Sequence, residues 1–329
     1  MTVLVTGGAG YIGSHVVLAL RDRGKACVVI DDMSTGSKSL LPDDVELVAG
    51  DIGDGALIGR LIERHKITSI VHLAASTSVP DSIRKPLAYY ANNTAKTCAL
   101  LQAAVDHGVG QFVLSSTAAV YGTPRQQMVD EDAPLNPQSP YGTSKLMAET
   151  ILRDAGAAHG LRFCILRYFN VAGADPALRA GQLESGALIK LATQAALGVR
   201  PGFQINGTDY DTPDGSCIRD FIHVTDLAAA HISALDYLAQ GGASATLNCG
   251  YGRGYSVLEI VSSLKRISGR DFPVSIAPRR PGDIDAIIAA NDRIRQTLAW
   301  SPQYDDVDVI LRDALAWERR LIDGVAPKS

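Results

Sequence analysis

Two side chains that could move a proton, Tyr141 and Lys145, lie four residues apart. Pro140 directly before them favours the start of a helix, and the spacing places both side chains on one helical face. A phenol with a reference pKa near ~10 is a poor base at neutral pH, and lowering that value to ~7 needs about 4 kcal/mol of selective stabilisation of the anion. A neighbouring ammonium supplies stabilisation of this kind. The pair is a candidate general base with its activating cation, although so short a pattern on its own more often indicates a surface pair.

A glycine-rich segment, Gly7 to Gly13, follows an apolar run and precedes a helix-forming segment. Glycines permit a tight turn and let the backbone approach a pyrophosphate, while a helix N-terminus offers free N–H groups to the anion. The alternative is a glycine-rich turn that binds nothing. The dinucleotide ligands predicted here are Gly7, Gly10, Tyr11, Ile12 and Gly13.

Acidic residues after the second and third predicted strands support the dinucleotide interpretation. Asp31 ends the second strand, where a carboxylate accepts hydrogen bonds from an adenine ribose. Asp31 and Asp32 would repel a 2′-phosphate, so NAD is favoured over NADP. Asp51 and Ile52 follow the third strand and are expected near the adenine, although Asp51 on its own would more often cap a loop.

Hydroxyl groups end the fifth predicted strand, at Ser115 and Thr117. Ligands meet open parallel sheets at this edge, so these groups should converge with Tyr141 and Lys145 on one crevice. There Lys145 and the positive nicotinamide ring would lower the pKa of the phenol. Thr117 would bind the substrate hydroxyl and relay its proton, unless it only satisfies backbone groups at the strand end.

The elements that must position these residues alternate between short β-branched runs and longer segments of helical period. The strand-like runs are Val3–Val5, Val28–Ile30, Val45–Val48, Ile70–Leu73, Phe112–Leu114 and Phe163–Leu166. The helical segments are Ser14–Arg23, Ala56–His65, Thr94–His107 and Ser144–His159. This alternation predicts an α/β fold, a Rossmann doubly wound parallel sheet that binds NAD.

The texture changes near Gly173, where glycine- and proline-rich loops separate less regular elements. We predict an NAD-binding domain over residues 1–172 and a smaller, interleaved C-terminal substrate domain over 173–215 and 251–329. Ile218–Leu227 and Thr246–Asn248 are strand-like enough to rejoin the main sheet, so the first domain should resume over about 216–250.

Composition excludes several classes of partner. The chain has 329 residues, 46% of them hydrophobic, and a formal net charge of −4 without a broad basic face. Binding to nucleic acid or to a membrane is therefore not expected. The five cysteines form no CxxC pair, which argues against a disulfide framework and against a metal site. Because an apolar strand stands in place of a signal sequence, a cytoplasmic location is expected.

Longer motifs resemble the extended short-chain dehydrogenase/reductase family, and within it the nucleotide-sugar 4-epimerases, over almost the whole chain. The matching segments are GGAGYIGSH (Gly7–His15), KPLAYYANN (Lys85–Asn93), YGTSK (Tyr141–Lys145), LRYFNVAGA (Leu166–Ala174), GTDYDTPDGSCIRDFIHV (Gly207–Val224) and PRRPGD (Pro278–Asp283). The long Gly207–Val224 match is hard to obtain by accident.

The resemblance implies an isomerase that interconverts UDP-glucose and UDP-galactose with a tightly held NAD. In this family the tyrosine phenolate, here Tyr141, takes the C4 hydroxyl proton while C4 passes a hydride to the nicotinamide. The 4-keto sugar then turns about its anchored UDP and takes the same hydride back on its other face. UDP-xylose, UDP-arabinose and UDP-N-acetylglucosamine are alternative substrates.

The resemblance also assigns residues to the cofactor and to the substrate. Those toward the cofactor are Asp32, Met33, Ser34, Thr35, Gly36, Leu73, Ala74, Ala75, Thr77, Asn92, Ser115, Tyr168 and Phe169, besides the residues named above. Those toward the UDP-sugar are Asn170, Leu188, Arg219, Arg280 and Asp283, with Thr117 and Tyr141. Arginine suits a diphosphate because it donates in a bidentate fork. Without the resemblance, Arg219 and Arg280 would be expected in solvent or in salt bridges.

Four positions depart from the family pattern. Thr117 stands where many members carry serine, and it keeps the hydroxyl. Ala187 replaces an asparagine or histidine near the diphosphate, and Asn206 replaces an aromatic that packs on uracil, which puts the family's contacts at these two substrate-binding positions in question. Ile287 occupies a wall where a bulky tyrosine excludes N-acetyl sugars and a small residue admits them, so isoleucine does not assign the sugar.

Other activities fit less well. A nucleotide-sugar 4,6-dehydratase needs an acid/base pair after the strand-end threonine, where this chain has Ala118 and Ala119. The glutamate of a UDP-glucuronate decarboxylase would likewise fall at Ala119. A non-catalytic NAD sensor is the alternative from another class, but it need not keep Thr117, Tyr141 and Lys145 together.

The resemblance finally implies a homodimer. Family members usually pair through two helices from each subunit, which form a four-helix bundle. Apolar faces within Thr94–His107 and Ser144–His159 favour the same pairing here.

Overall fold

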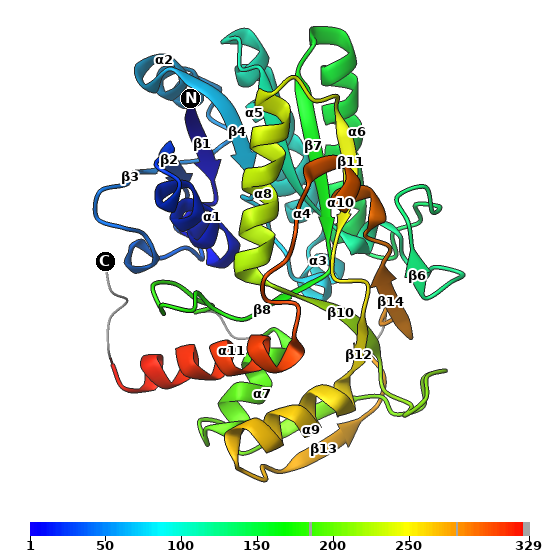
Figure 1. The fold of residues 1–329 in the computed structure, drawn as a ribbon. Coiled ribbons are helices and arrows are strands. Elements are labelled where there is room, and N and C mark those ends of the chain that lie inside the picture. The colour runs from blue at the N-terminus through cyan, green and yellow to red at the C-terminus, as the bar shows by residue number, and fades with distance from the viewer. Residues whose placement is uncertain (184–185, 281, 325–329) are drawn as a thin grey trace.

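The computed structural model describes residues 1–183, 186–280 and 282–324, and it has two lobes (Figure 1). Residue 281, inside the PRRPGD motif, lies outside the described residues. The upper lobe is built on a seven-stranded sheet whose pairs are all parallel, in the order β11-β7-β5-β4-β1-β2-β3. Its strands are β1 (Thr2–Thr6), β2 (Ala26–Asp31), β3 (Glu46–Ala49), β4 (Ile67–His72), β5 (Gln111–Thr117), β7 (Arg162–Tyr168) and β11 (Ala245–Cys249).

Helices cover both faces of this sheet. Both faces are apolar, as β1 illustrates. Successive strand side chains point to opposite faces, so Val3 and Val5 belong to one core cluster and Leu4 to the other. The first face is covered by α1 (Tyr11–Asp22) and α8 (Val224–Ala239), and the second by α2 (Gly55–His65), α5 (Lys96–Asp106) and α6 (Pro140–His159). The predicted doubly wound α/β fold is confirmed.

Capping residues define both ends of α6, the helix that carries the candidate proton-transfer pair. Ser139 is its N-cap and accepts a hydrogen bond from the Gly142 N–H, and Pro140 occupies the first turn. Gly160 ends the helix in the left-handed conformation. Leu152 and Ala148 bury the middle of α6 against the sheet, so its first turn is held on a rigid element.

The lower lobe contains a second sheet in the order β12-β10-β14-β6, with β8 also paired to β10, and a separate β13-β9 pair. Its strands are β6 (Met128–Val129), β8 (Asn170–Ala172), β9 (Phe203–Asn206), β10 (Ile218–His223), β12 (Gly254–Ser256), β13 (Val274–Ala277) and β14 (Ala286–Ala289). Three longer helices pack around one another in this lobe: α7 (Leu188–Ala196), α9 (Val257–Ser268) and α11 (Val307–Ile322).

Short helical segments complete the chain. They are η1 (Lys38–Leu40), α3 (Val79–Arg84), α4 (Pro86–Tyr89), η2 (Tyr90–Ala95), η3 (Ala118–Val120) and α10 (Asp292–Leu298). The segment η2 is a π-helix that continues directly into α5, a geometry often found at functional sites. Among the described helices, none is both long and apolar enough to cross a membrane.

The prediction was wrong for one of the two strands expected to rejoin the main sheet. Thr246–Asn248 does rejoin the main sheet, as part of β11 beside β7. Ile218–Leu227 does not, because β10 pairs with β8, β12 and β14 of the second sheet. Its last residues, Val224–Leu227, instead open α8, which His223 caps by accepting a hydrogen bond from the Thr225 N–H.

Candidate active site

The candidate residues of the upper lobe gather where the parallel strands end. The glycine-rich loop follows β1, Asp31 ends β2, Leu73–Ala75 follow β4, Thr117 ends β5 and Tyr168 ends β7. Because all these strands run in the same direction, their carboxyl ends share one edge, where open α/β sheets bind ligands. This edge faces the lower lobe (Figure 1).

Thr117 and Tyr141 contact each other at this edge, Lys145 follows one turn further along α6, and all three are almost fully buried. Their exposed fractions are 8%, 8% and 4%. Burial raises the pKa of Tyr141, while a hydrogen bond with the Thr117 hydroxyl acts to lower it. The phenol ring also meets the edge of Tyr89, with 6.5 Å between the ring centroids. The protein without a ligand thus favours the protonated phenol, and a phenolate requires added positive charge.

Lys145 is the source of positive charge on the same helix face. Burial lowers its pKa to about 8, and the negative charge of Glu149 acts in the opposite direction. His72 at the end of β4 adds no competing cation, because burial and the charge of Lys145 lower its pKa to about 3. Lys145 is therefore close to the balance between ammonium and amine near neutral pH.

The glycine-rich loop has room only for glycine at its closest approaches. A Cβ on Gly13 would lie 2.1 Å from the Gly7 carbonyl oxygen, and one on Gly7, where φ is +68°, would lie 2.6 Å from the Ala74 nitrogen. Gly10 is the N-cap of α1, and no side chain among the described residues caps this helix. The first-turn N–H groups of α1 are thus available to an anion, which fits the pyrophosphate of a dinucleotide.

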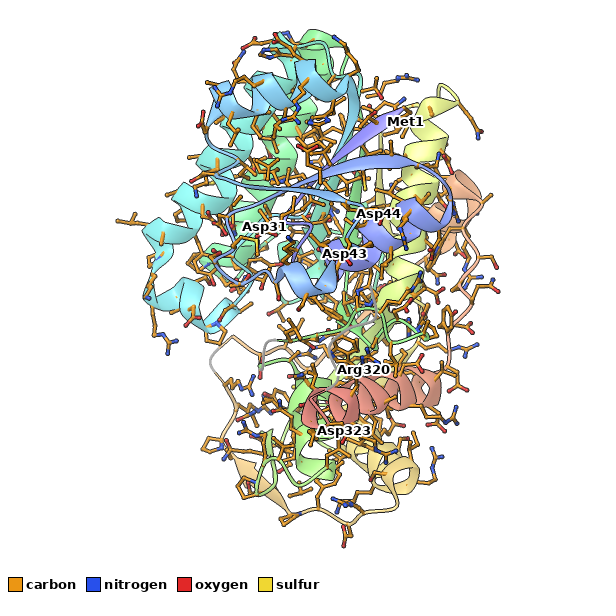
Figure 2. The ribbon with its side chains drawn as sticks, turned by 90° about the vertical axis from the view of Figure 1, so that its left-hand side faces the viewer. Met1, Asp31, Asp43, Asp44, Arg320 and Asp323 are labelled. Carbon is orange, nitrogen blue, oxygen red and sulfur yellow. The ribbon has the colours of Figure 1, made fainter. Side chains whose placement is uncertain are left out.

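Asp31 is held beside this loop. Its two carboxylate oxygens accept hydrogen bonds from the Ala9 and Met33 N–H groups, both at 2.9 Å. Burial raises its pKa, and these two hydrogen bonds act to lower it. Figure 2 labels Asp31 in the upper lobe, above Arg320 of α11 and Asp323, which follows that helix. A carboxylate fixed at this position fits a ribose diol and, together with the exposed Asp32, opposes a 2′-phosphate.

The remaining cofactor candidates lie in loops of the same edge. Met33 adopts a positive φ of 60°, Ser34 donates to Asp32, and a Cβ on Gly36 would approach Asp31 within 2.8 Å. Asp51 accepts a hydrogen bond from the Gly53 N–H and pairs with Lys96 at 2.7 Å, so it caps its loop as the alternative reading expected. The others are Thr35 beside Gly36, the buried Ile52 after β3, Leu73 to Ala75 and the exposed Thr77 after β4, Asn92 in η2, and Phe169 after β7.

Two contacts connect this edge to neighbouring elements. Ser115 lies 2.8 Å from the His231 Nε2 and also bonds to Tyr168, so its hydroxyl faces α8 and β7. The Tyr11 hydroxyl donates to the Gly173 carbonyl at 2.7 Å. The second contact ties the first turn of α1 to the segment that leads into the lower lobe.

The substrate candidates come mainly from the lower lobe. Arg219 of β10 and Ile287 of β14 are register neighbours. Ile287 shares an apolar cluster with Phe169 and Ala118, which follow β7 and β5. Through this cluster Ile287, the position expected to border the sugar, packs against the strand ends that hold the cofactor candidates.

Asn206 and Arg280 contact each other. With the Asn206 amide oriented by its hydrogen bonds, its oxygen accepts from the Arg280 Nη2 at 2.7 Å and from its Nε at 3.0 Å. Both residues line a cavity of about 390 Å³ next to β9 and β13. Asn170 begins β8, Ala187 is the N-cap of α7, Leu188 opens that helix, and Asp283 is exposed.

The sequence reading missed the groups that surround the proton-transfer pair. Asn93 in η2 donates to the Ser144 hydroxyl at 3.1 Å, and that hydroxyl donates to the Tyr141 carbonyl, so the π-helix holds the first turn of α6. Glu149 is fully buried and pairs with Arg167. The spacing of Glu149, four residues after Lys145, was the available signal, because it places the carboxylate on the same helix face.

Comparisons with known proteins agree with this geometry. Residues 3–250 match the model of the NAD dependent epimerase/dehydratase family. The UDP-glucose 4-epimerase of Azospirillum brasilense is 56% identical over 325 residues, which cover 98% of this chain and 93% of that protein. A structure of UDP-glucose 4-epimerase from Brucella ovis in complex with NAD has a TM-score of 0.93 at 41% identity, covering 96% of this chain and 97% of the other.

A third protein is as similar in structure. The UDP-glucose 4-epimerase of Stenotrophomonas maltophila, solved with bound NAD and formylated UDP-arabinopyranose, has a TM-score of 0.95 at 37% identity and covers 99% of this chain and 100% of the other. The family match covers residues 3–250, and the relatives and structures extend the similarity over nearly the whole chain. The chain belongs to the NAD dependent epimerase/dehydratase family.

Proposed function

We propose that the protein is an isomerase that interconverts UDP-glucose and UDP-galactose by NAD-dependent epimerisation at C4. The observation that carries this is the buried group of Thr117, Tyr141 and Lys145, placed at the same sheet edge as an uncapped helix N-terminus and Asp31. Relatives with the same architecture are UDP-glucose 4-epimerases, which supports the reaction and the substrate class.

Thr117, Tyr141 and Lys145 each have a separate role in the proposed proton transfer. The Thr117 hydroxyl, already hydrogen-bonded to Tyr141, holds the C4 hydroxyl of the sugar. The Tyr141 phenolate takes the proton of that C4 hydroxyl and later returns it. To the Lys145 ammonium, one helical turn away on α6, we assign the stabilisation of the phenolate against the burial that raises the pKa of Tyr141. The glycine-rich loop and Asp31 would hold NAD, which would supply the acceptor for the C4 hydride.

We assign the nucleotide end of the substrate to the lower lobe. Arg219 and Arg280 are the cationic groups for the diphosphate, and the cavity beside Asn206 receives the uridine. No side chain among the described residues caps α7, whose N-terminus begins after Ala187, so Leu188 can meet the diphosphate through its backbone N–H. Anchoring by the lower lobe leaves the sugar free to present either face to Tyr141.

The lobes are also the basis for a domain proposal. We assign residues 1–172 and about 216–250 to an NAD-binding domain, and residues 173–215 and 251–329 to a UDP-sugar-binding domain. The packing of α8 on the main sheet and the pairing of β11 with β7 support the return of the chain to the first domain over about 216–250. The pairing of β10 with the second sheet moves residues 218–223 toward the other domain.

Substrate assays test the function. The purified protein, without added NAD, should convert UDP-glucose and UDP-galactose into one another, as identified from the sugars released by mild hydrolysis. UDP-xylose, UDP-arabinose and UDP-N-acetylglucosamine, tested in parallel, rank the alternatives that Ile287 leaves open. A 4-keto-6-deoxy product would favour a dehydratase, against which the buried Ala118 and neighbouring Ala119 argue. No product even with added NAD would favour a sensor.

We further propose a homodimer in a reducing compartment such as the cytoplasm. Each of the five cysteines, all within the described residues, is free. The apolar residues expected at the interface, such as Leu100 and Leu152, are buried in the chain's own core. The pairing surface must therefore use exposed side chains on α6 and its neighbours, such as Met147 and Leu87, exposed by 43% and 81%.

Light scattering at micromolar concentration is expected to give twice the mass of the chain, and Met147→Glu should shift this mass toward the monomer. A monomeric mass for the unaltered protein would reject the dimer.

A further inference from the structure

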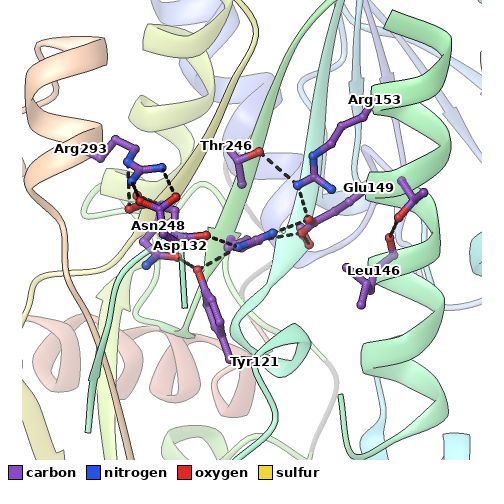
Figure 3. Close-up of polar contacts among 12 residues, drawn as sticks. Tyr121, Asp132, Leu146, Glu149, Arg153, Thr246, Asn248 and Arg293 are labelled. Atoms are coloured by element: carbon purple, nitrogen blue, oxygen red, sulfur yellow. Dashed lines mark hydrogen bonds and ion pairs between the residues drawn. The ribbon is translucent and has the colours of Figure 1, made fainter. Parts of the chain in front are cut away.

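Glu149 is a fully buried carboxylate one helical turn after Lys145 on α6. Its Oε1 accepts hydrogen bonds from the Ser116 hydroxyl at 2.5 Å and from the Arg167 Nε at 3.0 Å. Its Oε2 accepts from the Arg167 Nη2 at 2.7 Å and from the Arg153 Nη2 at 2.8 Å. Figure 3 shows Glu149 reaching from α6 toward the sheet, where Tyr121 and Asn248 lie in the same polar network. Both oxygens of the carboxylate are thus occupied by donors.

These donors keep the carboxylate ionised. Burial acts to raise the pKa of Glu149, but the hydrogen bonds and charge of Arg167 and the hydrogen bond from Ser116 outweigh it, so the pKa lies below its ordinary value. A buried ion pair of this kind adds little net stability compared with apolar side chains of the same volume. Its position one turn from the proposed proton-transfer pair therefore directs attention to a role other than stability.

The two strand donors also set the position of α6. Ser116 of β5 and Arg167 of β7 are register partners, and each directly precedes a candidate site residue, Thr117 or Tyr168. Successive strand residues point to opposite faces, so Ser116 and Arg167 face α6. Glu149 therefore joins both strand ends to the helix that carries Lys145.

Among the described residues, His72 and Glu149 are the two titratable groups whose charge is coupled to that of Lys145, and of these only Glu149 is negatively charged. His72 from β4 is neutral, since its pKa is about 3. Tyr141 from α6, Tyr89 from α4 and Tyr168 from β7 all have raised pKa values and stay protonated in the unliganded protein. Arg167 and Arg153 are paired with the Glu149 carboxylate itself, and Glu131 and Arg293 pair with each other further along the network.

We propose that Glu149 is a positioning residue that keeps Lys145 in its ammonium form inside the buried site, and that Arg167 and Ser116 serve it by holding the carboxylate ionised. This inference rests on the proposed role of Lys145 in the epimerisation. Removing the negative charge makes the ammonium less favourable, so Lys145 loses its proton at a lower pH. The active combination of phenolate and ammonium is then lost earlier as pH rises.

The test is a direct titration of Lys145. In protein labelled with ¹³C at lysine Cε, the Lys145 resonance is assigned by its absence in Lys145→Arg and followed by NMR against pH. We expect a midpoint near 8 in the unaltered protein. In Glu149→Gln the midpoint should fall by about one pH unit, and the alkaline limb of kcat should move the same way. At pH 8, such a shift lowers the ammonium population about fivefold.

Two variants separate this role from a structural one. Glu318→Gln removes another buried carboxylate, paired with Lys190 between α11 and α7, and should lower the Tm without moving the Lys145 midpoint. Glu149→Asp keeps the charge and should restore the midpoint toward that of the unaltered protein. If Glu149→Gln does not fold, Ser116→Ala replaces it, with a smaller shift in the same direction expected.

An unchanged Lys145 midpoint in the Gln or Ala variant, with activity reduced equally at every pH, would overturn the proposal. The titration needs no substrate. Failure of epimerisation in the unaltered protein, together with a shifted midpoint, would therefore reject the proposed function and leave the effect of Glu149 on Lys145 intact.

Discussion

Tyr141→Phe is expected to lower kcat by about 10²–10⁴-fold, the range for loss of a general acid–base group. The exchange removes one oxygen from a buried ring that packs against Tyr89, so the fold and the glycine-rich loop remain. The measurement compares initial rates of UDP-galactose conversion and the NAD content of the purified protein. Activity should fall while NAD content stays the same.

Tyr237→Phe is the matched control, because it removes the same hydroxyl from a partly buried ring of α8 that packs against the core. We expect it to keep ordinary rates. Unchanged activity in Tyr141→Phe would remove Tyr141 from the mechanism and revive the sensor hypothesis.

Gly13→Ala should cost the protein its NAD. The added Cβ would stand 2.1 Å from the Gly7 carbonyl oxygen, a backbone atom that cannot move without opening the turn. A displacement of about 1 Å at a binding site can cost about 10²-fold in activity, and the affinity for NAD should fall with it. The measurements are the NAD retained through purification and the activity at saturating added NAD.

Gly55→Ala controls for the glycine-to-alanine exchange itself. Gly55 opens α2, and apart from its chain neighbours and the backbone of its own helix no described atom lies within 4 Å of its added Cβ. Because alanine is the better helix former, this variant should retain NAD and be as stable or more stable. If Gly13→Ala purified with a full complement of NAD, the loop would not be the pyrophosphate site.

The upper lobe could be predicted because its signals are local. Each strand of the main sheet is a short apolar run between helix-period segments, and β1 shows the two-faced burial that such runs indicate. The position of β10 could not be predicted, because the residues of a strand do not indicate which other strands it pairs with. Ile218 pairs with Ser256 and Ala286, far along the chain, and β10 continues into α8 without an intervening loop.

The candidate site divides in the same way. The glycine-rich loop, Asp31 and the Tyr141/Lys145 spacing are carried by short motifs, so their placement at one edge followed from the fold. The pairing of Glu149 with Arg167 joins a helix to a strand 18 residues away, and the contact of Asn206 with Arg280 joins the end of β9 to the loop after β13. Neither has a periodicity or spacing that a sequence displays.

The second sheet has a consequence for how such proteins diversify. Arg219 and Ile287 stand on β10 and β14, which pair within the lower lobe, while Thr117 and Tyr141 stand on β5 and α6 of the upper lobe. On the proposed assignment, recognition and proton transfer are encoded by separately paired strands. Substitutions in β14 can accumulate without disturbing the register between β5 and β7. A lineage can thus exchange one sugar for another while it inherits its chemistry unchanged.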